Sequence, residues 1–229
     1  MKKKRIGILG GISYQSTIEY YRLIMEKYFE KFQDYYSPEI VIFNLDFQKF
    51  TDFENNDKEN YINYIMEGIN SLKNAGVDFI IMAANSPHAV FDEIKEKNKI
   101  PMISIAEVTA DKAKKLGLKK LLLLGIKFTM QSSFYKEVCN KRNIEVIVPD
   151  ESEQDEINRI IFKELCSGLF REESKIKLFN IINRYDVGGV ILGCTELPLL
   201  LKQEASNRRL LNTLELHAEA ALNSALNSV

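Results

Sequence analysis

Two equivalent segments of the chain place a thiol in one copy and a methyl group in the other. Cys194 lies in Gly-Gly-Val-Ile-Leu-Gly-Cys-Thr-Glu-Leu-Pro, and Ala84 lies in Val-Asp-Phe-Ile-Ile-Met-Ala-Ala-Asn-Ser-Pro-His. When the segments are aligned, Ala84 falls on Cys194, Asn85 on Thr195 and Ser86 on Glu196. Each apolar run followed by small and polar residues is typical of a buried parallel strand that delivers side chains at its C-terminal end. The pair therefore predicts a two-base site with one base missing.

Cys194 has neighbours that favour reactivity. A lone cysteine is most often a small buried hydrophobe. This one lies between Gly193 and Thr195, just past a strand, where backbone N–H groups converge. Such amides are expected to lower the thiol pKa from roughly 8.5. A thiol of that kind can transfer a proton, or it can attack a carbonyl or alkene carbon. Glu196 is within reach of the same site.

The elements that must position these residues alternate between short apolar runs and longer helical patterns, which predicts an α/β fold with parallel sheets. Ser86 and Pro87 are expected as the N-cap and first residue of a helix. The strands are expected at residues 5–10, 39–45, 77–82, 102–105, 120–125, 144–148, 189–192 and 209–211. The helices are expected at residues 16–32, 58–74, 87–97, 108–116, 129–143, 153–166, 175–185 and 215–226.

The pattern restarts near the middle of the chain, which indicates an internal duplication. Ile8-Leu9-Gly10-Gly11 matches Leu123-Leu124-Gly125-Ile126, and the Ala84 and Cys194 segments follow at nearly the same offset. We therefore expect two similar lobes related by a pseudo-two-fold axis, one of residues 1–100 plus 208–229 and one of residues 101–207. Open parallel sheets bind ligands at the C-terminal ends of their strands, so the site is expected between the lobes.

Composition narrows the class of protein. The formal net charge is −1, so there is no overall field to attract nucleic acid or an anionic membrane. The apolar runs are strand-sized, too short to span a bilayer. Three widely spaced cysteines make neither a disulfide framework nor a zinc site, and a reduced cytoplasmic enzyme fits them. Gly7, Gly10 and Gly11 lack the full G-x-G-x-x-G spacing, so no dinucleotide, and no other cofactor, is expected.

A set of short motifs makes a family resemblance specific. They are Gly-Gly-Ile-Ser-Tyr-Gln-Ser-Thr (10–17), Met-Ala-Ala-Asn-Ser-Pro-His (82–88), Gly-Ile-Lys-Phe-Thr-Met (125–130), Asn-Arg-Ile-Ile-Phe (158–162) and Gly-Cys-Thr-Glu (193–196). In this order and spacing the chain resembles the aspartate/glutamate racemase family over essentially its whole length. The resemblance implies cofactor-independent racemisation of aspartate or glutamate by two cysteines on opposite faces of Cα, one from each lobe.

The resemblance also implies roles for individual residues. Cys194 is the second-lobe cysteine. Substrate contacts fall to Asn85, Ser86 and Thr195 at the α-carboxylate, with Ser13, Gln48, Thr129 and Glu196 lining the same site. In two-cysteine relatives a lysine contacts the distal carboxylate. Here Cys166 occupies that place and Lys163 lies one helical turn before it, which leaves the choice between aspartate and glutamate open. Relatives are often dimers, and the aromatic residues of the first helix suit a homodimer interface.

Ala84 is the main departure, since a methyl group cannot transfer a proton. Its face needs a water or another residue, and His88 is the nearest candidate one turn further on. His88 also has a purely structural interpretation, as a first-turn residue bonded to a neighbouring loop. Two other functions remain open. One is a decarboxylase or other lyase of the same superfamily, which needs only one thiol. The other is an inactive protein that binds an acidic amino acid.

Overall fold

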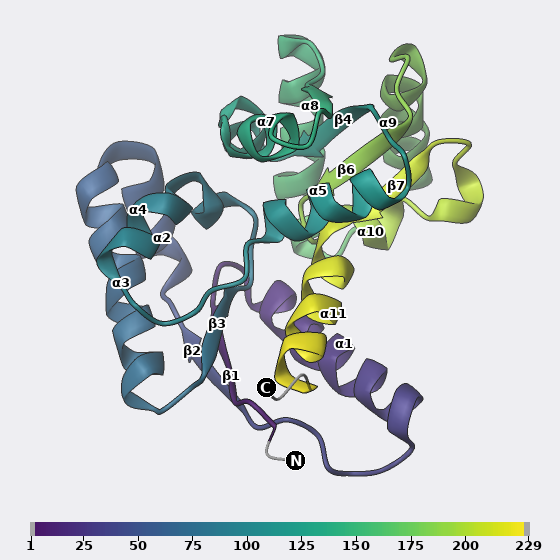
Figure 1. The fold of residues 1–229 in the computed structure, drawn as a ribbon. Coiled ribbons are helices and arrows are strands. Elements are labelled where there is room, and N and C mark those ends of the chain that lie inside the picture. The colour runs from purple at the N-terminus through teal and green to yellow at the C-terminus, as the bar shows by residue number, and fades with distance from the viewer. Residues whose placement is uncertain (1–2, 227–229) are drawn as a thin grey trace. The chain divides into compact units, whose positions relative to one another are not determined.

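The computed structural model describes residues 3–226, and they form two compact units (Figure 1). The first unit comprises the described residues up to Ser104 together with those from His217 onward, and the second is Ile105–Leu216. The expected division at residues 207 and 208 falls before a strand that belongs to the sheet of the second unit. The return to the first unit therefore comes later in the chain than the sequence suggested.

The first unit is built on a three-stranded parallel sheet of order β2-β1-β3. Its strands are β1 (Ile6–Gly10), β2 (Ile40–Asn44) and β3 (Phe79–Met82). Every residue of β1 and β3 is buried, because helices cover both faces. These helices are α1 (Tyr14–Phe32), α2 (Phe47–Asn56), α3 (Lys58–Asn74), the 3₁₀ helix η1 (Ser86–Val90) and α4 (Phe91–Lys97). In Figure 1, α2, α3 and α4 lie on one side of this sheet and α1 on the other.

The second unit is built on a four-stranded parallel sheet of order β5-β4-β6-β7. Its strands are β4 (Lys120–Gly125), β5 (Glu145–Ile147), β6 (Gly189–Gly193) and β7 (Arg209–Asn212). The helices of this unit are α5 (Ile105–Lys115), α6 (Lys127–Gln131), α7 (Phe134–Asn140), α8 (Glu151–Lys163), η2 (Leu165–Ser167), α9 (Glu172–Arg184), α10 (Leu197–Leu200) and η3 (Gln203–Ala205). The last helix, α11 (Thr213–Leu226), begins in the second unit and belongs to the first unit from His217 onward. The expected α/β class with parallel sheets is confirmed.

The same strand order recurs in both units. β1 lies between β2 and β3 just as β4 lies between β5 and β6. In each unit a threonine after the central strand packs on that strand's last glycine. A Cβ on Gly10 would lie 2.5 Å from Thr17 Cγ2, and one on Gly125 would lie 3.3 Å from Thr129 Cβ. Glycine at these two positions lets the following helix approach the strand end closely.

Several expected elements differ in the structure. The strand expected at 102–105 is reduced to a single bridge between Ile80 and Met102, because α5 already begins at Ile105. The helix expected at 129–143 is divided into α6 and α7. Ser86 is the first residue of η1 and not its N-cap, and Asn85, which precedes it, makes no side-chain capping bond. The helix α2 was not expected, and it begins where Asp46 accepts a bond from the backbone N–H of Lys49.

No described helix combines the length and the apolar character that crossing a membrane requires.

Candidate functional site

The C-terminal end of β6 carries the thiol of Cys194 and the carboxylate of Glu196. Cys194 Sγ donates a hydrogen bond of 2.9 Å to Glu196 Oε2, and Thr195 Oγ1 donates one of 2.9 Å to the same oxygen. Glu196 is buried, whereas Cys194 and Thr195 are half-buried. The three consecutive residues thus form one hydrogen-bonded group, in which the carboxylate of Glu196 accepts from both neighbours.

The pKa of Cys194 is shifted in the opposite direction to the one expected. Burial raises it well above its ordinary value of 9.0, and the nearby negative charge and hydrogen bond of Glu196 raise it further. One backbone N–H, that of Glu196, acts in the lowering direction but is outweighed. The expectation of a thiolate poised near neutrality is therefore wrong for the resting protein. Cys194 is a thiol whose proton points at a carboxylate.

A second thiol, that of Cys166, is also affected by the charge of Glu196. Burial raises the pKa of Cys166, on η2, to about 12, and the charge of Glu196 contributes to the rise. The charge of Cys166 in turn raises the pKa of Cys194. The thiols of Cys166 and Cys194 are therefore both under the influence of the Glu196 charge. Lys163 is the last residue of α8 and is exposed.

Thr129 lies beside this strand end. A Cβ on Gly193, the residue before Cys194, would lie 3.5 Å from Thr129 Cγ2. Thr129 is fully buried, and its Oγ1 has no hydrogen-bond partner among the described residues. A buried hydroxyl without a partner costs about 1–3 kcal/mol. This placement brings together three of the residues singled out in the second unit, Thr129, Cys194 and Glu196.

The equivalent strand end of the first unit is apolar where the second unit has its thiol. Ala84 belongs to the hydrophobic core of the first unit, together with Phe50, Tyr61 and Val90. Asn85 and Ser86 follow it and are both buried. The hydroxyl of Ser16, on α1, donates to the carbonyl of Ala83 and so joins the helix to this strand end.

His88 lies next to Ala84 but in the interior. Its Nδ1 lies 3.1 Å from the carbonyl oxygen of Ala84, and its ring stacks on Phe91 at a centroid distance of 5.3 Å. The ring of His217 meets it edge-on at 5.8 Å. Burial lowers the pKa of His88 to about 3, and the neighbouring His217 lowers it as well. The imidazole is therefore neutral at physiological pH.

Ser13 and Gln48 follow the other two strands of the first sheet. Ser13 is half-buried and caps α1, since its Oγ accepts a 3.3 Å bond from the N–H of Ser16. Gln48 is exposed in the first turn of α2 and donates a 2.8 Å bond to Asp52. Both lie at the C-terminal edge of the sheet that also carries Ala84, which is the edge where α/β sheets bind ligands.

Glu54 was not among the residues expected at the site. Its carboxylate, on α2, accepts a 3.0 Å bond from the hydroxyl of Tyr61 and is also hydrogen-bonded to the hydroxyl of Ser86. Sequence analysis missed it because it also missed α2. The available signal was Asp46, which follows a strand and can cap a helix.

Comparison with known proteins identifies the family. The model of the Asp/Glu/hydantoin racemase family matches residues 9–221. The chain belongs to this family. Among the relatives of this racemase-family chain is a broad-specificity amino-acid racemase of Bacillus subtilis (strain 168), 29% identical over 159 residues that cover 68% of this chain and 69% of that protein. A glutamate racemase of Hydrogenobaculum sp. is 31% identical over 152 residues, 62% of this chain and 55% of that protein.

Solved structures of the racemase family share the fold. An aspartate racemase homologue from Pyrococcus horikoshii OT3 superposes with a TM-score of 0.86 at 38% identity and covers 99% of this chain and 100% of its own. The aspartate racemase of Picrophilus torridus superposes with a TM-score of 0.79 at 25% identity and covers 99% of this chain and 96% of its own. Membership of the family and its two-sheet architecture therefore rest on independent sequence and structural matches.

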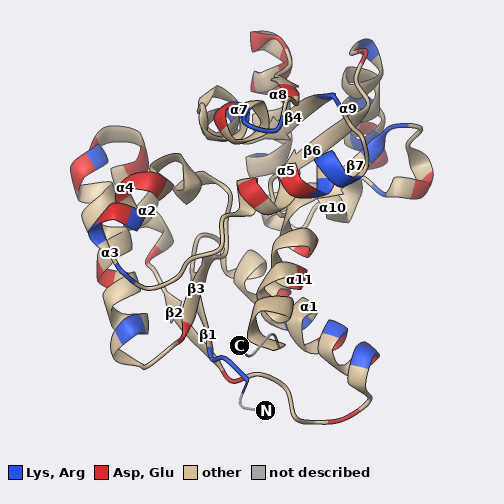
Figure 2. Cartoon of the chain, in the orientation of Figure 1, with Lys and Arg blue, Asp and Glu red and all other residues tan. Residues whose placement is uncertain are grey.

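Among residues 3–226, the positive and negative side chains of this racemase-family chain are mixed along the helices. Figure 2 shows lysine and arginine interspersed with aspartate and glutamate along the helices. Within residues 3–226, no cluster of three or more histidine, cysteine, aspartate or glutamate side chains is arranged to hold a metal ion.

Proposed function

We propose that this protein is a cofactor-independent racemase of aspartate or glutamate, of a branch that lacks the first cysteine. The observation that carries the proposal is the hydrogen bond between Cys194 and Glu196 at the end of β6, in a chain of the racemase family. A thiol with a buried carboxylate as its partner can be deprotonated and reprotonated without outside help. That is the property required of one face of a two-face proton exchange.

On the Cys194 face the proposed reaction moves two protons and leaves one electron pair on the substrate. The thiol proton of Cys194 passes to the carboxylate of Glu196, and the resulting thiolate takes the proton from Cα of the substrate. The electron pair of the Cα–H bond remains on the substrate, delocalised into its carboxylate. In the opposite direction the thiol returns a proton to Cα. The raised pKa of Cys194 favours this protonating direction, because the thiol form dominates in the resting protein.

Substrate binding is proposed for the polar residues at the two strand ends, which would act on one substrate. Asn85, Ser86 and Thr195 would hold the α-carboxylate, and Thr129 would offer its buried, unpartnered hydroxyl. Ser13, Gln48, Lys163 and Glu196 complete the proposed contacts. On the Ala84 face a water or another residue must move the proton. His88 is a weak base for this role, because its pKa is lowered to about 3.

Isotope exchange tests the function directly. In D₂O, L- and D-aspartate and L- and D-glutamate are incubated with the protein, and deuterium at Cα and the opposite enantiomer are measured. We expect both for at least one amino acid, and Cys194→Ser should abolish both, whereas Cys139→Ser, at a buried thiol in α7, should not. Binding by calorimetry without exchange, at high protein concentration, would instead identify an inactive binding protein.

A single-thiol lyase is a second candidate, favoured by the state of Cys194. A decarboxylase that loses CO₂ from a substituted malonate needs only a thiol to protonate the resulting enediolate. The protonated Cys194 meets that need, and Ala84 would then be no deficit. Release of CO₂ from an aryl- or alkyl-malonate, with no exchange at Cα of any acidic amino acid, would establish the lyase in place of the racemase.

We also propose a homodimer through the exposed face of α1 and a location in a reducing compartment such as the cytoplasm. Tyr14, Ile18 and Tyr21 are exposed at helical spacing on α1, as Phe29 and Phe32 are further along it. The three cysteines are free thiols, which suits reducing conditions. Sedimentation equilibrium at micromolar concentration tests the dimer, and a monomer there would contradict it.

A further inference from the structure

The face of the first unit that lacks a cysteine is next to a carboxyl group that can move a proton. Ser86 lies two residues after Ala84, and its hydroxyl is hydrogen-bonded to the side chains of both Glu54 and Tyr61. Tyr61 donates its own proton to Glu54 over 3.0 Å. Three polar groups from η1, α2 and α3 thus meet at an otherwise apolar core, of which Ala84 and Tyr61 are both members.

Because a serine hydroxyl carries a single proton, its hydrogen bond with Glu54 controls whether Ser86 can accept or donate a proton elsewhere. A serine hydroxyl has one proton to donate and two lone pairs that accept. When Glu54 is ionised it draws the proton of Ser86, and the Oγ lone pairs remain available to accept one. When Glu54 is protonated it can donate to Oγ, and the Ser86 proton is released for another acceptor. The protonation state of Glu54 therefore sets the direction in which Ser86 can transfer a proton.

The surroundings of Glu54 suit this role. The side chain is half-buried, Tyr61 is fully buried, and Ser86 is 6% exposed. Burial raises the pKa of Glu54 above its ordinary 4.5, and the hydrogen bonds from Ser86 and Tyr61 oppose the rise. A carboxyl group of raised pKa is a stronger base when ionised and stays closer to the pH at which both of its forms are populated.

We propose that Ser86 exchanges protons with Cα on the Ala84 face and that Glu54 acts through it, by receiving and returning the hydroxyl proton. This inference rests on the proposed racemase function. It makes Glu54 a positioning residue and proton store for Ser86. It replaces the α-carboxylate contact proposed above for Ser86 by proton transfer and leaves that carboxylate to Asn85 and Thr195. Tyr61 holds the Glu54 carboxylate in place through its hydrogen bond.

The proposed step conserves protons and electrons. As the Cα–H bond breaks, its proton goes to Ser86 Oγ while the Ser86 hydroxyl proton goes to the Glu54 carboxylate. The electron pair of the Cα–H bond stays on the substrate. In the return step the Glu54 carboxyl proton goes to Oγ and the Ser86 proton goes to Cα. Serine is unchanged over a full cycle, and only Glu54 gains or loses a proton.

The experiment separates inversion at Cα from exchange on a single face. Glu54→Gln, Ala84→Cys and the double variant are compared with the wild-type chain. Glu59→Gln, on the exposed first turn of α3, serves as the matched control. Each enantiomer of aspartate and glutamate is incubated in D₂O. Loss of the Cα–H signal is followed by NMR, and inversion is followed by chiral chromatography.

Glu54→Gln is expected to slow inversion by about 100-fold to 10,000-fold, the usual contribution of a positioned acid or base. Exchange should persist for the one enantiomer whose Cα–H faces Cys194. Glu59→Gln should behave as wild type. Ala84→Cys supplies its own thiol on this face, so the double variant should invert the substrate within about tenfold of Ala84→Cys alone, a rescue that a merely structural role of Glu54 does not produce.

Two results would contradict the Glu54–Ser86 proton relay without contradicting the racemase function. If wild type inverts the substrate and Glu54→Gln does so at the same rate, the relay is wrong and the racemase stands. If Glu54→Gln loses inversion and exchange of both enantiomers equally, and Ala84→Cys fails to rescue it, then Glu54 only maintains the fold. If wild type shows neither inversion nor exchange with any of the four amino acids, the racemase function fails and the relay fails with it.

Discussion

Removing the charge of Glu196 should make Cys194 more reactive toward an alkylating agent. The substitution Glu196→Gln keeps the shape of the side chain but removes the negative charge that now disfavours a thiolate 2.9 Å away. Burial, the largest cause of the raised pKa, stays in place, while the second and third causes are lost. The variant should therefore have a lower Cys194 pKa than wild type.

The size of the effect follows from the geometry. For charge centres about 4 Å apart at an effective dielectric constant of about 20, the repulsion is about 4 kcal/mol. Each unit by which the pKa falls gives about tenfold more thiolate. Each unit also costs about threefold in nucleophilicity at a Brønsted coefficient of about 0.5. Removing a repulsion of about 4 kcal/mol favours the thiolate by up to about 1,000-fold, and the lower nucleophilicity offsets about half of that gain on a logarithmic scale, so the alkylation rate at pH 8 should rise by up to about 30-fold.

The assay is timed alkylation with iodoacetamide followed by mass spectrometry of the peptide that contains Cys194. Cys139 is fully buried in α7 and serves as an internal reporter of loosened structure. Glu204→Gln, at an exposed position of η3, is the matched control. An unchanged Cys194 rate in Glu196→Gln, with Cys139 still protected, would refute the argument that the Glu196 charge holds the thiol protonated.

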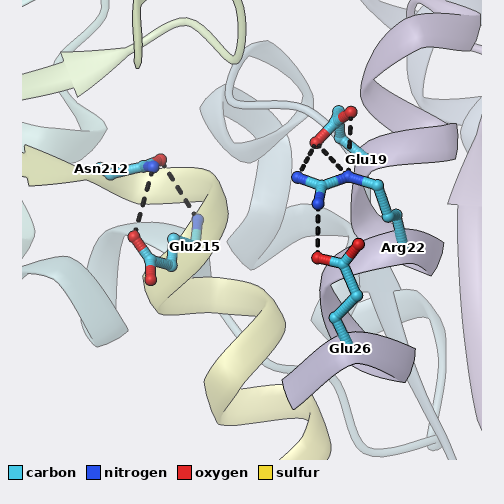
Figure 3. Close-up of polar contacts among 5 residues, drawn as sticks. All are labelled: Glu19, Arg22, Glu26, Asn212 and Glu215. Carbon is cyan, nitrogen blue, oxygen red and sulfur yellow. Dashed lines mark hydrogen bonds and ion pairs between the residues drawn. The ribbon is translucent and has the colours of Figure 1, made fainter. Parts of the chain in front are cut away.

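Two further predictions concern stability. Burial lowers the pKa of His217 to about 4, against about 6.5 in the unfolded chain, so the unfolded chain binds more protons between these pH values. The free energy of unfolding should fall by about 1.5 kcal/mol from His217 alone between pH 6.5 and 5. Urea unfolding of His217→Gln should show a shallower fall, and equal slopes would contradict the assignment. At the start of α11, Asn212 Oδ1 accepts a 3.2 Å bond from the backbone N–H of Glu215 (Figure 3). Asn212→Ala should lower the unfolding free energy by about 1 kcal/mol, whereas Asn223→Ala, exposed later in the same helix, should not lower it; equal losses would exclude a capping effect.

The sequence predicted the sheets well because buried parallel strands are marked by composition. β1, β3, β4 and β6 are apolar runs that end in small residues or are followed by them, and each lies within two residues of its expected position. The duplicated strand order then follows from the repeated motifs. The short elements were less predictable. In α2 only Phe50 is buried, so the helix lacks the apolar stripe that marks most helices in a sequence.

The sequence proposed residues for the candidate site but did not reveal the contacts among them. Cys194, Thr195 and Glu196 are consecutive, so their proximity was visible in the sequence. The sequence did not show whether the backbone amides or the Glu196 carboxylate would have the larger effect on the pKa of the Cys194 thiol, because that depends on side-chain direction and burial. The contact of Ser86 with Glu54 joins residues from separate helices, and no local pattern in the sequence marks it.

The ion pairs on the surface of α1 are predictable from the sequence but contribute little to stability. Arg22 lies between Glu19 and Glu26 and pairs with both, as Figure 3 shows. The spacing of three and four residues makes such pairs predictable from sequence alone. Exposed pairs of this kind contribute little to stability, so what is easiest to predict here is not what holds the fold together.

The division of the chain into a continuous and a discontinuous unit has a consequence for its synthesis. The second unit, Ile105–Leu216, is one uninterrupted stretch, whereas the first is completed only by the residues from His217 onward. Those last residues bury Ala218, Leu222 and Ala225, and the carbonyl of Ala225 accepts a bond from the N–H of Lys4. At about 5–20 residues per second, the ribosome needs on the order of ten seconds to make the intervening unit. For that time the nascent first unit carries uncovered apolar surface. The half of the protein that is made first is therefore the half that finishes folding last.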